Sequence, residues 1–264
     1  QLKILDEKKL KQFNQIKKIG RGSTSEVFEV SREKHYAQKF LFFEDETDIE
    51  NMKKLLNEHY ILSKLNSPYI IKTFGMSFGT ETEQPSIILE LCSSNLKQRL
   101  KYLNDVERCR VICEVSKGMR DVHSAGLIHR DLKLENILLD EENHVKLSDF
   151  GFCTLIKSDT MTSRSIITGT LKYMAPELIL EKTDYDEKVD VYAFGVVVYV
   201  IAMNGEFPKI SIIDVGNGKK AEIPSTMTTF TRELINNCWA FNASDRPSFD
   251  EICKMLEGNE NKLI

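Results

Sequence analysis

The sequence has no long hydrophobic run and no excess of basic residues. Its 264 residues carry 36 Lys and Arg against 40 Asp and Glu, a net charge of −4, which argues against binding to a nucleic-acid backbone. The longest apolar run, Val189–Met203, holds about 15 residues, fewer than the ~20 that span a bilayer, and Asp190 lies near its start. We therefore expect no membrane span and interpret this run as a buried core helix.

Paired cysteines and targeting signals are also missing. The six cysteines form no CxxC pair and have no histidine at zinc-ligand spacing, so we expect reduced thiols in a cytoplasmic protein. The lysine-rich start of the chain contains no apolar signal segment, and it does not begin with methionine, so we expect a piece of a longer protein. A composition of 41% hydrophobic and 29% charged residues is typical of a folded globular domain.

The first third of the chain has the pattern of a small sheet. Short runs rich in β-branched and aromatic residues predict strands at Phe13–Ile19, Val27–Val30, His35–Phe43, Ile70–Phe74 and Ile87–Leu91. One helix interrupts them, because Thr47–Glu50 is typical of a capping box and apolar residues then recur at three- and four-residue steps.

After Ser93 the pattern changes to long helical stretches. They are predicted at Val106–His123, Asp186–Asn204, Thr228–Asn237 and Phe249–Leu256. We thus expect an α+β fold in which a short polar join near Cys92–Asn95 connects a strand-rich half to a larger helical half. Such joins commonly border a ligand cleft.

A glycine-rich segment, Ile19–Val27, lies between two of the expected strands. Its glycines let backbone amides approach phosphate oxygens, although glycine pairs more often serve a hairpin turn. On the next strand Lys39 stands among apolar residues, whereas a strand lysine is usually exposed at an edge. Glu58 offers Lys39 a partner, because helical spacing places this acid on the core side of its helix, where a carboxylate needs an opposite charge.

Two further strings place polar groups on loops. In His129–Asn136, Asp131 and Asn136 lie five positions apart, where they could orient a hydroxyl group and hold a metal ion, respectively. Asp149-Phe150-Gly151 follows the expected short strand Val145–Leu147 and adds a second oxygen donor before a glycine that permits a sharp turn. The first string, taken alone, would also suit a charged surface loop.

The order of these motifs, followed by Ala175-Pro176-Glu177, resembles the eukaryotic protein kinase family. The resemblance implies a bilobal fold, with a small β-rich N-lobe that holds one key helix and a larger, mainly helical C-lobe. It implies one kinase domain over 1–264, with the N-lobe at about 13–91, the hinge at about 90–95 and the C-lobe at about 96–258. Asn237-Cys238-Trp239 and Asp245–Phe249 resemble the tyrosine-kinase-like group of serine/threonine kinases.

The resemblance also implies ATP and Mg²⁺ (or Mn²⁺) as cofactors. Lys39 would hold the α- and β-phosphates and be oriented by Glu58, while Asn136 and Asp149 would hold the metal ions. Leu89 would be the gatekeeper residue beside adenine. The residues implied to surround the nucleotide are Ile19, Gly20, Arg21, Gly22, Ser23, Thr24, Ser25, Glu26, Val27, Ala37, Lys39, Leu89, Glu90, Cys92 and Leu138, with Ser25 in place of the third glycine of the loop.

The same resemblance implies protein substrates. Asp131 would accept or orient the proton of the substrate hydroxyl, Lys133 would pair with the γ-phosphate, and Thr170 would hydrogen-bond to both side chains. A lysine two residues after the catalytic aspartate is typical of serine/threonine kinases, so we expect serine and threonine acceptors.

The resemblance also implies regulation by phosphorylation of the activation loop, the segment between Asp149 and Glu177. The residue that points to it is Arg130, which precedes Asp131. A phosphate in that loop would pair with the arginine, and Ser165 and Thr168 are the candidate sites. An upstream activator or autophosphorylation in trans would supply it. The resemblance further implies that Asp190 holds the backbone of the catalytic loop, His129–Asn136.

Two alternatives have the same fold but another function. A pseudokinase generally lacks the lysine, the catalytic aspartate or the metal aspartate, whereas Lys39, Asp131 and Asp149 are all present here. A small-molecule kinase lacks the peptide-docking segment that Gly169–Glu177 resembles. We therefore expect a protein serine/threonine kinase, with a nucleotide-binding pseudokinase scaffold as the alternative.

Overall fold

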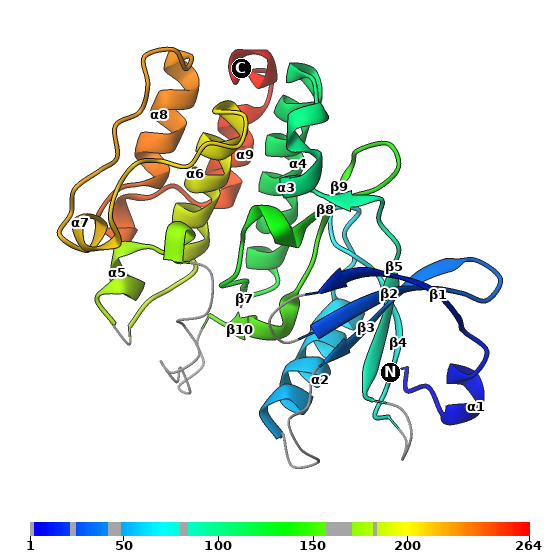
Figure 1. Ribbon diagram of the computed structural model, residues 1–264. Coiled ribbons are helices and arrows are strands. Elements are labelled where there is room, and N and C mark those ends of the chain that lie inside the picture. The colour runs from blue at the N-terminus through cyan, green and yellow to red at the C-terminus, as the bar shows by residue number, and fades with distance from the viewer. Residues whose placement is uncertain (1–2, 22–24, 42–48, 80–83, 157–170, 182–183) are drawn as a thin grey trace.

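The chain folds into a strand-rich lobe and a helical lobe in the computed structural model (Figure 1), which describes residues 3–21, 25–41, 49–79, 84–156, 171–181 and 184–264. The strands are β1 (Asn14–Arg21), β2 (Ser25–Ser31), β3 (His35–Leu41), β4 (Thr73–Ser77), β5 (Ser86–Glu90), β6 (Ser94–Asn95), β7 (Leu127–Ile128), β8 (Ile137–Leu139), β9 (Val145–Leu147) and β10 (Thr154–Leu155). The α-helices are α1 (Glu7–Leu10), α2 (Ile49–Lys64), α3 (Leu96–Arg99), α4 (Asp105–Ser124), α5 (Pro176–Ile179), α6 (Lys188–Ala202), α7 (Ile212–Gly216), α8 (Thr229–Cys238) and α9 (Phe249–Leu256).

An antiparallel sheet with the order β1-β2-β3-β5-β4 forms the first lobe. Its register places Val27 opposite Lys39 and Ala37 opposite Leu89. Because side chains alternate between the two faces of a strand, these four residues share one face of the sheet. Together with the helical second lobe, this arrangement confirms the expected α+β bilobal fold.

The strand expected at Ile70–Phe74 was wrong in position, since β4 begins only at Thr73. The isoleucines before it are buried against the other lobe, where the Ile71 amide donates to the Leu147 carbonyl over 3.0 Å and the Leu147 amide donates to the Tyr69 carbonyl over 2.7 Å. An apolar run predicts burial, but it does not tell a strand from an extended link between two lobes.

A segment ahead of the expected N-lobe extends this sheet. Ile4 pairs in parallel with Met76 of β4, and the Leu5 amide donates to the Met76 carbonyl over 2.7 Å. Leu5 and Leu10 are buried in a small apolar cluster with Ile88 of β5. The segment therefore covers a sheet edge that would otherwise carry unpaired backbone groups.

The helical lobe is built around α6, whose residues from Val189 to Ile201 are all buried. Around α6, helix α4 packs against α9, and α6 packs against α8. The N-terminal boundaries of α4 and α9 follow from capping boxes, Asn104 with Glu107 and Ser248 with Glu251. Each box satisfies two backbone amides at the start of its helix. Among the described residues, no helix combines the length and apolar character needed to cross a membrane.

Candidate functional site

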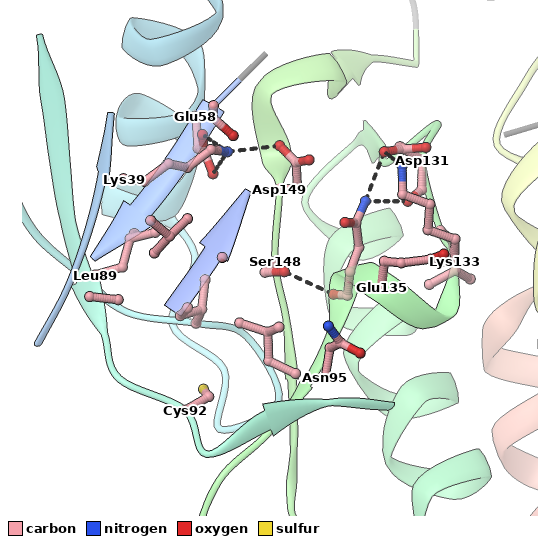
Figure 2. Close-up of a pocket in the computed structure, with 18 of the residues that line it drawn as sticks. Lys39, Glu58, Leu89, Cys92, Asn95, Asp131, Lys133, Glu135, Ser148 and Asp149 are labelled. Atoms are coloured by element: carbon pink, nitrogen blue, oxygen red, sulfur yellow. Dashed lines mark hydrogen bonds and ion pairs between the residues drawn. The ribbon is translucent and has the colours of Figure 1, made fainter. Parts of the chain in front are cut away.

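A cleft of about 910 Å³ opens between the two lobes. Figure 2 shows side chains entering it from the sheet, from α2 and from the loops of the helical lobe. Of the residues expected around a nucleotide, it is lined by Ile19, Gly20, Arg21, Ser25, Val27, Ala37, Lys39, Leu89, Glu90, Cys92 and Leu138. Gly22, Ser23 and Thr24 lie outside the described residues.

Glu26 is the one described member of that set that does not line the cleft. Its carboxylate instead forms an ion pair with Lys18 of β1. The physical reason is strand alternation: Ser25 and Val27 face the cleft, so the side chain between them points to the other face of β2.

Lys39 is the centre of a buried charge cluster. Its Nζ lies 2.8 Å from Glu58 Oε2 on α2 and 3.0 Å from Asp149 Oδ1 on the loop after β9, as Figure 2 shows. Burial disfavours the ammonium ion, but the carboxylates of Asp149 and Glu58 outweigh that cost, and the pKa of Lys39 is raised above its ordinary value. The raised pKa favours the charged form of this ammonium group, which lies between carboxylates of both lobes.

Asp149 is held in its position by backbone conformation as well as by charge. Its backbone has φ of 65°, in the left-handed region that non-glycine residues rarely adopt. Burial acts to raise the pKa of its carboxyl group, but the nearby Lys39 reverses this effect and the pKa is lowered. The next residue, Phe150, is fully buried, with its ring edge-on to His129 at a centroid distance of 4.8 Å.

A second cluster of polar side chains lies across the cleft, on the loop before β8. Lys133 Nζ is 2.5 Å from Asp131 Oδ2, and Asn136 Nδ2 donates to the same oxygen over 2.8 Å. The amide nitrogen of Asn136 also donates to the Asp131 backbone carbonyl over 2.8 Å. With its nitrogen committed to Asp131, Asn136 has its amide oxygen left for another ligand.

Asp190, at the start of α6, holds the backbone of this loop by hydrogen bonds. Its Oδ2 and Oδ1 accept hydrogen bonds from the backbone amides of His129 and Arg130, each over 2.8 Å, and Oδ2 lies 2.9 Å from His123 Nε2. Arg130 has φ of 69°, so these bonds hold a backbone conformation that a side chain disfavours. The scaffold contact expected of Asp190 is thus present.

The donors in the cleft suit a hard divalent cation that is shared with a phosphate ligand. Asp149 offers a carboxylate and Asn136 an amide oxygen, and Mg²⁺ is usually held by one or two carboxylates together with substrate phosphates. No cluster of three or more His, Cys, Asp or Glu side chains that could hold a metal by itself occurs in the described ranges. These residues therefore fit a metal that enters with its phosphate ligand.

The segment that joins the two lobes borders the inner end of the cleft. Leu89 is almost completely buried beside Ala37, whereas Cys92, which also lines the cleft, is half-buried. Burial raises the pKa of the Cys92 thiol to about 12, which disfavours its thiolate form. All six cysteines are free thiols, as expected.

Of the three expected regulatory residues, the structure describes Arg130 alone. The Arg130 guanidinium lies over the ring of Tyr185, 5.6 Å from its centroid. Ser165, Thr168 and Thr170 lie outside the described residues. The segment after them is anchored, because Arg246 donates to both oxygens of Glu177 over 2.6 and 2.8 Å.

Sequence reasoning missed several residues that line the cleft. Lys54 is one turn before Glu58 on α2, and its ammonium lies over the Phe152 ring at 5.4 Å from the centroid. Glu135 pairs with Lys97 over 2.8 Å, and Asn95 caps α3 by accepting from the Gln98 amide. The four-residue spacing of Lys54 to Glu58 could have predicted that both side chains lie on the same face of α2. The other contacts cross between segments and leave no periodic signal.

Comparisons with known proteins agree with this geometry. The family model described as the protein kinase domain matches residues 13–256. The chain is 34% identical to the dual specificity protein kinase pyk3 of Dictyostelium discoideum, over 94% of the chain and 19% of that protein. It is 32% identical to the probable serine/threonine-protein kinase drkD of the same organism, over 91% of the chain and 19% of that protein.

A plant relative extends the comparison. The chain is 29% identical to the serine/threonine-protein kinase STY17 of Arabidopsis thaliana, over 97% of the chain and 45% of that protein. The chain thus spans less than half of each of these three relatives. With the family model covering most of its length, and with the lysine, the acidic residues and the asparagine of the motifs gathered in one cleft, the chain belongs to the protein kinase domain family.

Proposed function

We propose that the chain transfers the γ-phosphate of ATP, with Mg²⁺ (or Mn²⁺), to serine and threonine hydroxyls of other proteins. The observation that carries the proposal is the convergence of Glu58 and Asp149 on Lys39, opposite the cluster of Asp131, Lys133 and Asn136. Phosphoryl transfer requires positioning and charge neutralisation more than covalent chemistry by the protein. A cleft with a fixed cation on one wall and a carboxylate on the other supplies both.

In this proposal the nucleotide occupies the inner cleft. Adenine lies between Val27 and Ala37 above and Leu138 below, with Glu90 and Cys92 offering backbone hydrogen bonds. The ammonium of Lys39 binds the α- and β-phosphates. Asn136 and Asp149 would hold a divalent ion, which would neutralise negative charge on the phosphates.

The chemical step places the substrate hydroxyl beside Asp131. The hydroxyl oxygen forms a bond to the γ-phosphorus, its proton passes to the Asp131 carboxylate, and the bond between the γ-phosphorus and the bridging oxygen of ADP breaks. Lys133, 2.5 Å from Asp131, then lies close enough to balance charge on the transferred group.

The preference for serine and threonine is a separate part of the proposal. It is supported by Lys133 and by the names of relatives such as STY17, while pyk3 carries the name of a dual specificity kinase. We assign Thr170 a substrate-side role by the same resemblance. Phosphoamino-acid analysis of labelled product should give phosphoserine and phosphothreonine, and abundant phosphotyrosine would overturn this preference.

Regulation and location complete the proposal. Phosphorylation of Ser165 or Thr168, by an upstream activator or in trans, would offer Arg130 an anionic partner. Phosphatase treatment would then lower the rate, and an unchanged rate would contradict this part. The free thiols suit the reducing cytoplasm, where we place the protein.

The test of the proposed function is a transfer assay with γ-labelled ATP and generic protein substrates. Wild type should label them, whereas labelling by no form of the protein, under varied metal and phosphorylation conditions, would favour the pseudokinase alternative. Labelling of small amino-alcohols without labelling of proteins would instead favour a small-molecule kinase.

A further inference from the structure

Helix α2 is attached to the loop after β9 by a contact that lies outside the charge cluster. Asn57 Nδ2 donates a hydrogen bond of 2.8 Å to the backbone carbonyl of Cys153. Asn57 directly precedes Glu58, the residue that pairs with Lys39. The contact therefore holds α2 one residue before Glu58, whose position determines whether its carboxylate reaches Lys39.

The acceptor of this hydrogen bond is itself well fixed. Cys153 is almost completely buried, and its amide donates to the Phe150 carbonyl over 3.1 Å. The residue after it begins β10, whose Thr154 and Leu155 pair with Ile128 and Leu127 of β7. Because β7 runs directly into His129-Arg130-Asp131, this pairing ties the Cys153 carbonyl to the strand that leads into the catalytic loop.

Two neighbouring side-chain contacts of this interface are less directional, whereas the Glu58 carboxylate also accepts a hydrogen bond from the Phe150 backbone. Lys54 lies over the Phe152 ring at 5.4 Å, a contact without a fixed direction along the helix. A Cβ added at Gly151 would meet Lys54 Cβ at 3.7 Å, which is ordinary van der Waals distance. The hydrogen bond of Asn57 is directional, so it can set how far α2 sits from the loop.

Helix propensity does not account for an asparagine at this position. Asn57 lies in the interior of α2, and asparagine is a poorer helix former than alanine, lysine or glutamate. Its side chain is half-buried at the interface instead of being fully solvated. The hydrogen bond to Cys153 therefore explains an asparagine at this position better than helix propensity does.

We propose that Asn57 is a positioning residue that holds α2 closed on the segment after Asp149, so that Glu58 reaches Lys39. Asn57 does not line the cleft, and it acts through Glu58. This inference rests on the proposed function for its kinetic part, and on the hydrogen bond to Cys153 for its structural part.

The kinetic test is a double-mutant cycle. Asn57→Ala should lower kcat about three- to tenfold, the worth of one hydrogen bond, and Asn57→Asp, which cannot donate, should do at least as much. In a Glu58→Ala background the further effect of Asn57→Ala should vanish, because its target is already gone. Asn236→Ala, which removes an exposed asparagine from α8, is the matched control and should leave kcat unchanged.

The structural test is hydrogen exchange, which does not require activity. Asn57→Ala should speed amide exchange in α2 and β10 but not in α6. An unchanged exchange pattern would overturn the inference, and so would a kcat loss that persists in full in the Glu58→Ala background. If wild type itself transferred no phosphate, the proposed function would fail while the exchange result still decided the role of Asn57.

Discussion

At the scale of single residues, Lys39 serves both the stability of the fold and the chemistry of the cleft. Its ammonium offsets the charge of Glu58, whose side chain is 2% exposed. A buried carboxylate without a partner is costly, and removing one member of a buried ion pair costs more than replacing both. The two roles can therefore be separated by substitution.

Lys39→Met should lower the free energy of unfolding by about 3 kcal/mol, because it leaves Glu58 buried and unpaired, and should lower kcat/KM by about 10²-fold or more. The double variant Lys39→Met/Glu58→Leu should recover most of the stability but none of the transfer. Urea unfolding and steady-state kinetics on the same samples check this. A double variant that recovers transfer would contradict the role given to Lys39.

Asp190 gives the catalytic loop a stability that depends on pH. Burial acts to raise the pKa of its carboxyl group, but hydrogen bonding to His123 and to backbone amides outweighs this, and the pKa is lowered from its ordinary value of 3.8. A group with a depressed folded pKa stabilises the fold above its unfolded pKa, and this contribution is lost as the pH falls through the folded pKa.

Asp190→Asn should therefore lower the free energy of unfolding at pH 7 by about 2 kcal/mol, since it weakens charge-assisted hydrogen bonds. The difference between wild type and variant should persist at pH 5 and shrink below pH 3.8. Chemical denaturation at a series of pH values measures it. A difference that grows on acidification would contradict the assignment.

At the scale of elements, the segment before β1 belongs to the sheet. Gly75 on β4 has φ of +154°, and a Cβ there would lie 2.9 Å from Leu5 Cγ and 3.0 Å from the Lys3 carbonyl oxygen. Glycine is thus required by the close approach of the segment.

Gly75→Ala should destabilise the fold by about 1–3 kcal/mol more than Gly126→Ala does, because overpacking is added to the cost of a positive φ. Gly126 is the matched control, with φ of +75° and open space around its Cα. Adding Leu5→Ala to Gly75→Ala should reduce the excess, since it removes the nearest side chain. Equal costs for the two glycine variants would show that the segment is not packed on β4.

At the scale of the whole molecule, the cleft joins two lobes that a bound nucleotide would bridge. A ligand that binds only the folded state stabilises it by about 2.7 kcal/mol at 100 times its Kd, or about 5–10 °C in Tm for a chain of this size. ATP with Mg²⁺ should produce such a shift, and chelation of the metal should remove most of it. Asp149→Ala should abolish the dependence on metal, and a shift that ignores chelation would contradict the metal role of Asp149.

Much of this architecture could be predicted from the sequence, because it depends on periodic or local signals. Helix α9 was predicted with the observed bounds, and β3 was placed by its aromatic residues. The contact of Lys39 with Glu58 followed from the cost of burying each charge. The motif order then placed the lysine, the aspartates and the asparagine in one cleft.

The parts that could not be predicted depend on contacts between distant segments. The docking of Leu5 on β4 requires a partner about seventy residues away, and the acceptor for Asn57 is a backbone carbonyl, which any residue type would supply. Ile70 and Ile71 have the apolar character of a strand but pack between the lobes. Neither composition nor spacing encodes such pairings.

The central claim is that Asp131 acts on the substrate hydroxyl in a transfer reaction, and the most direct measurement is kcat for labelled-phosphate transfer by Asp131→Asn. We expect kcat to fall about 10²-fold or more, with nucleotide affinity and Tm retained. Asp250→Asn, an exposed aspartate on α9, is the matched control and should behave like wild type. Equal transfer by Asp131→Asn and wild type would contradict the account.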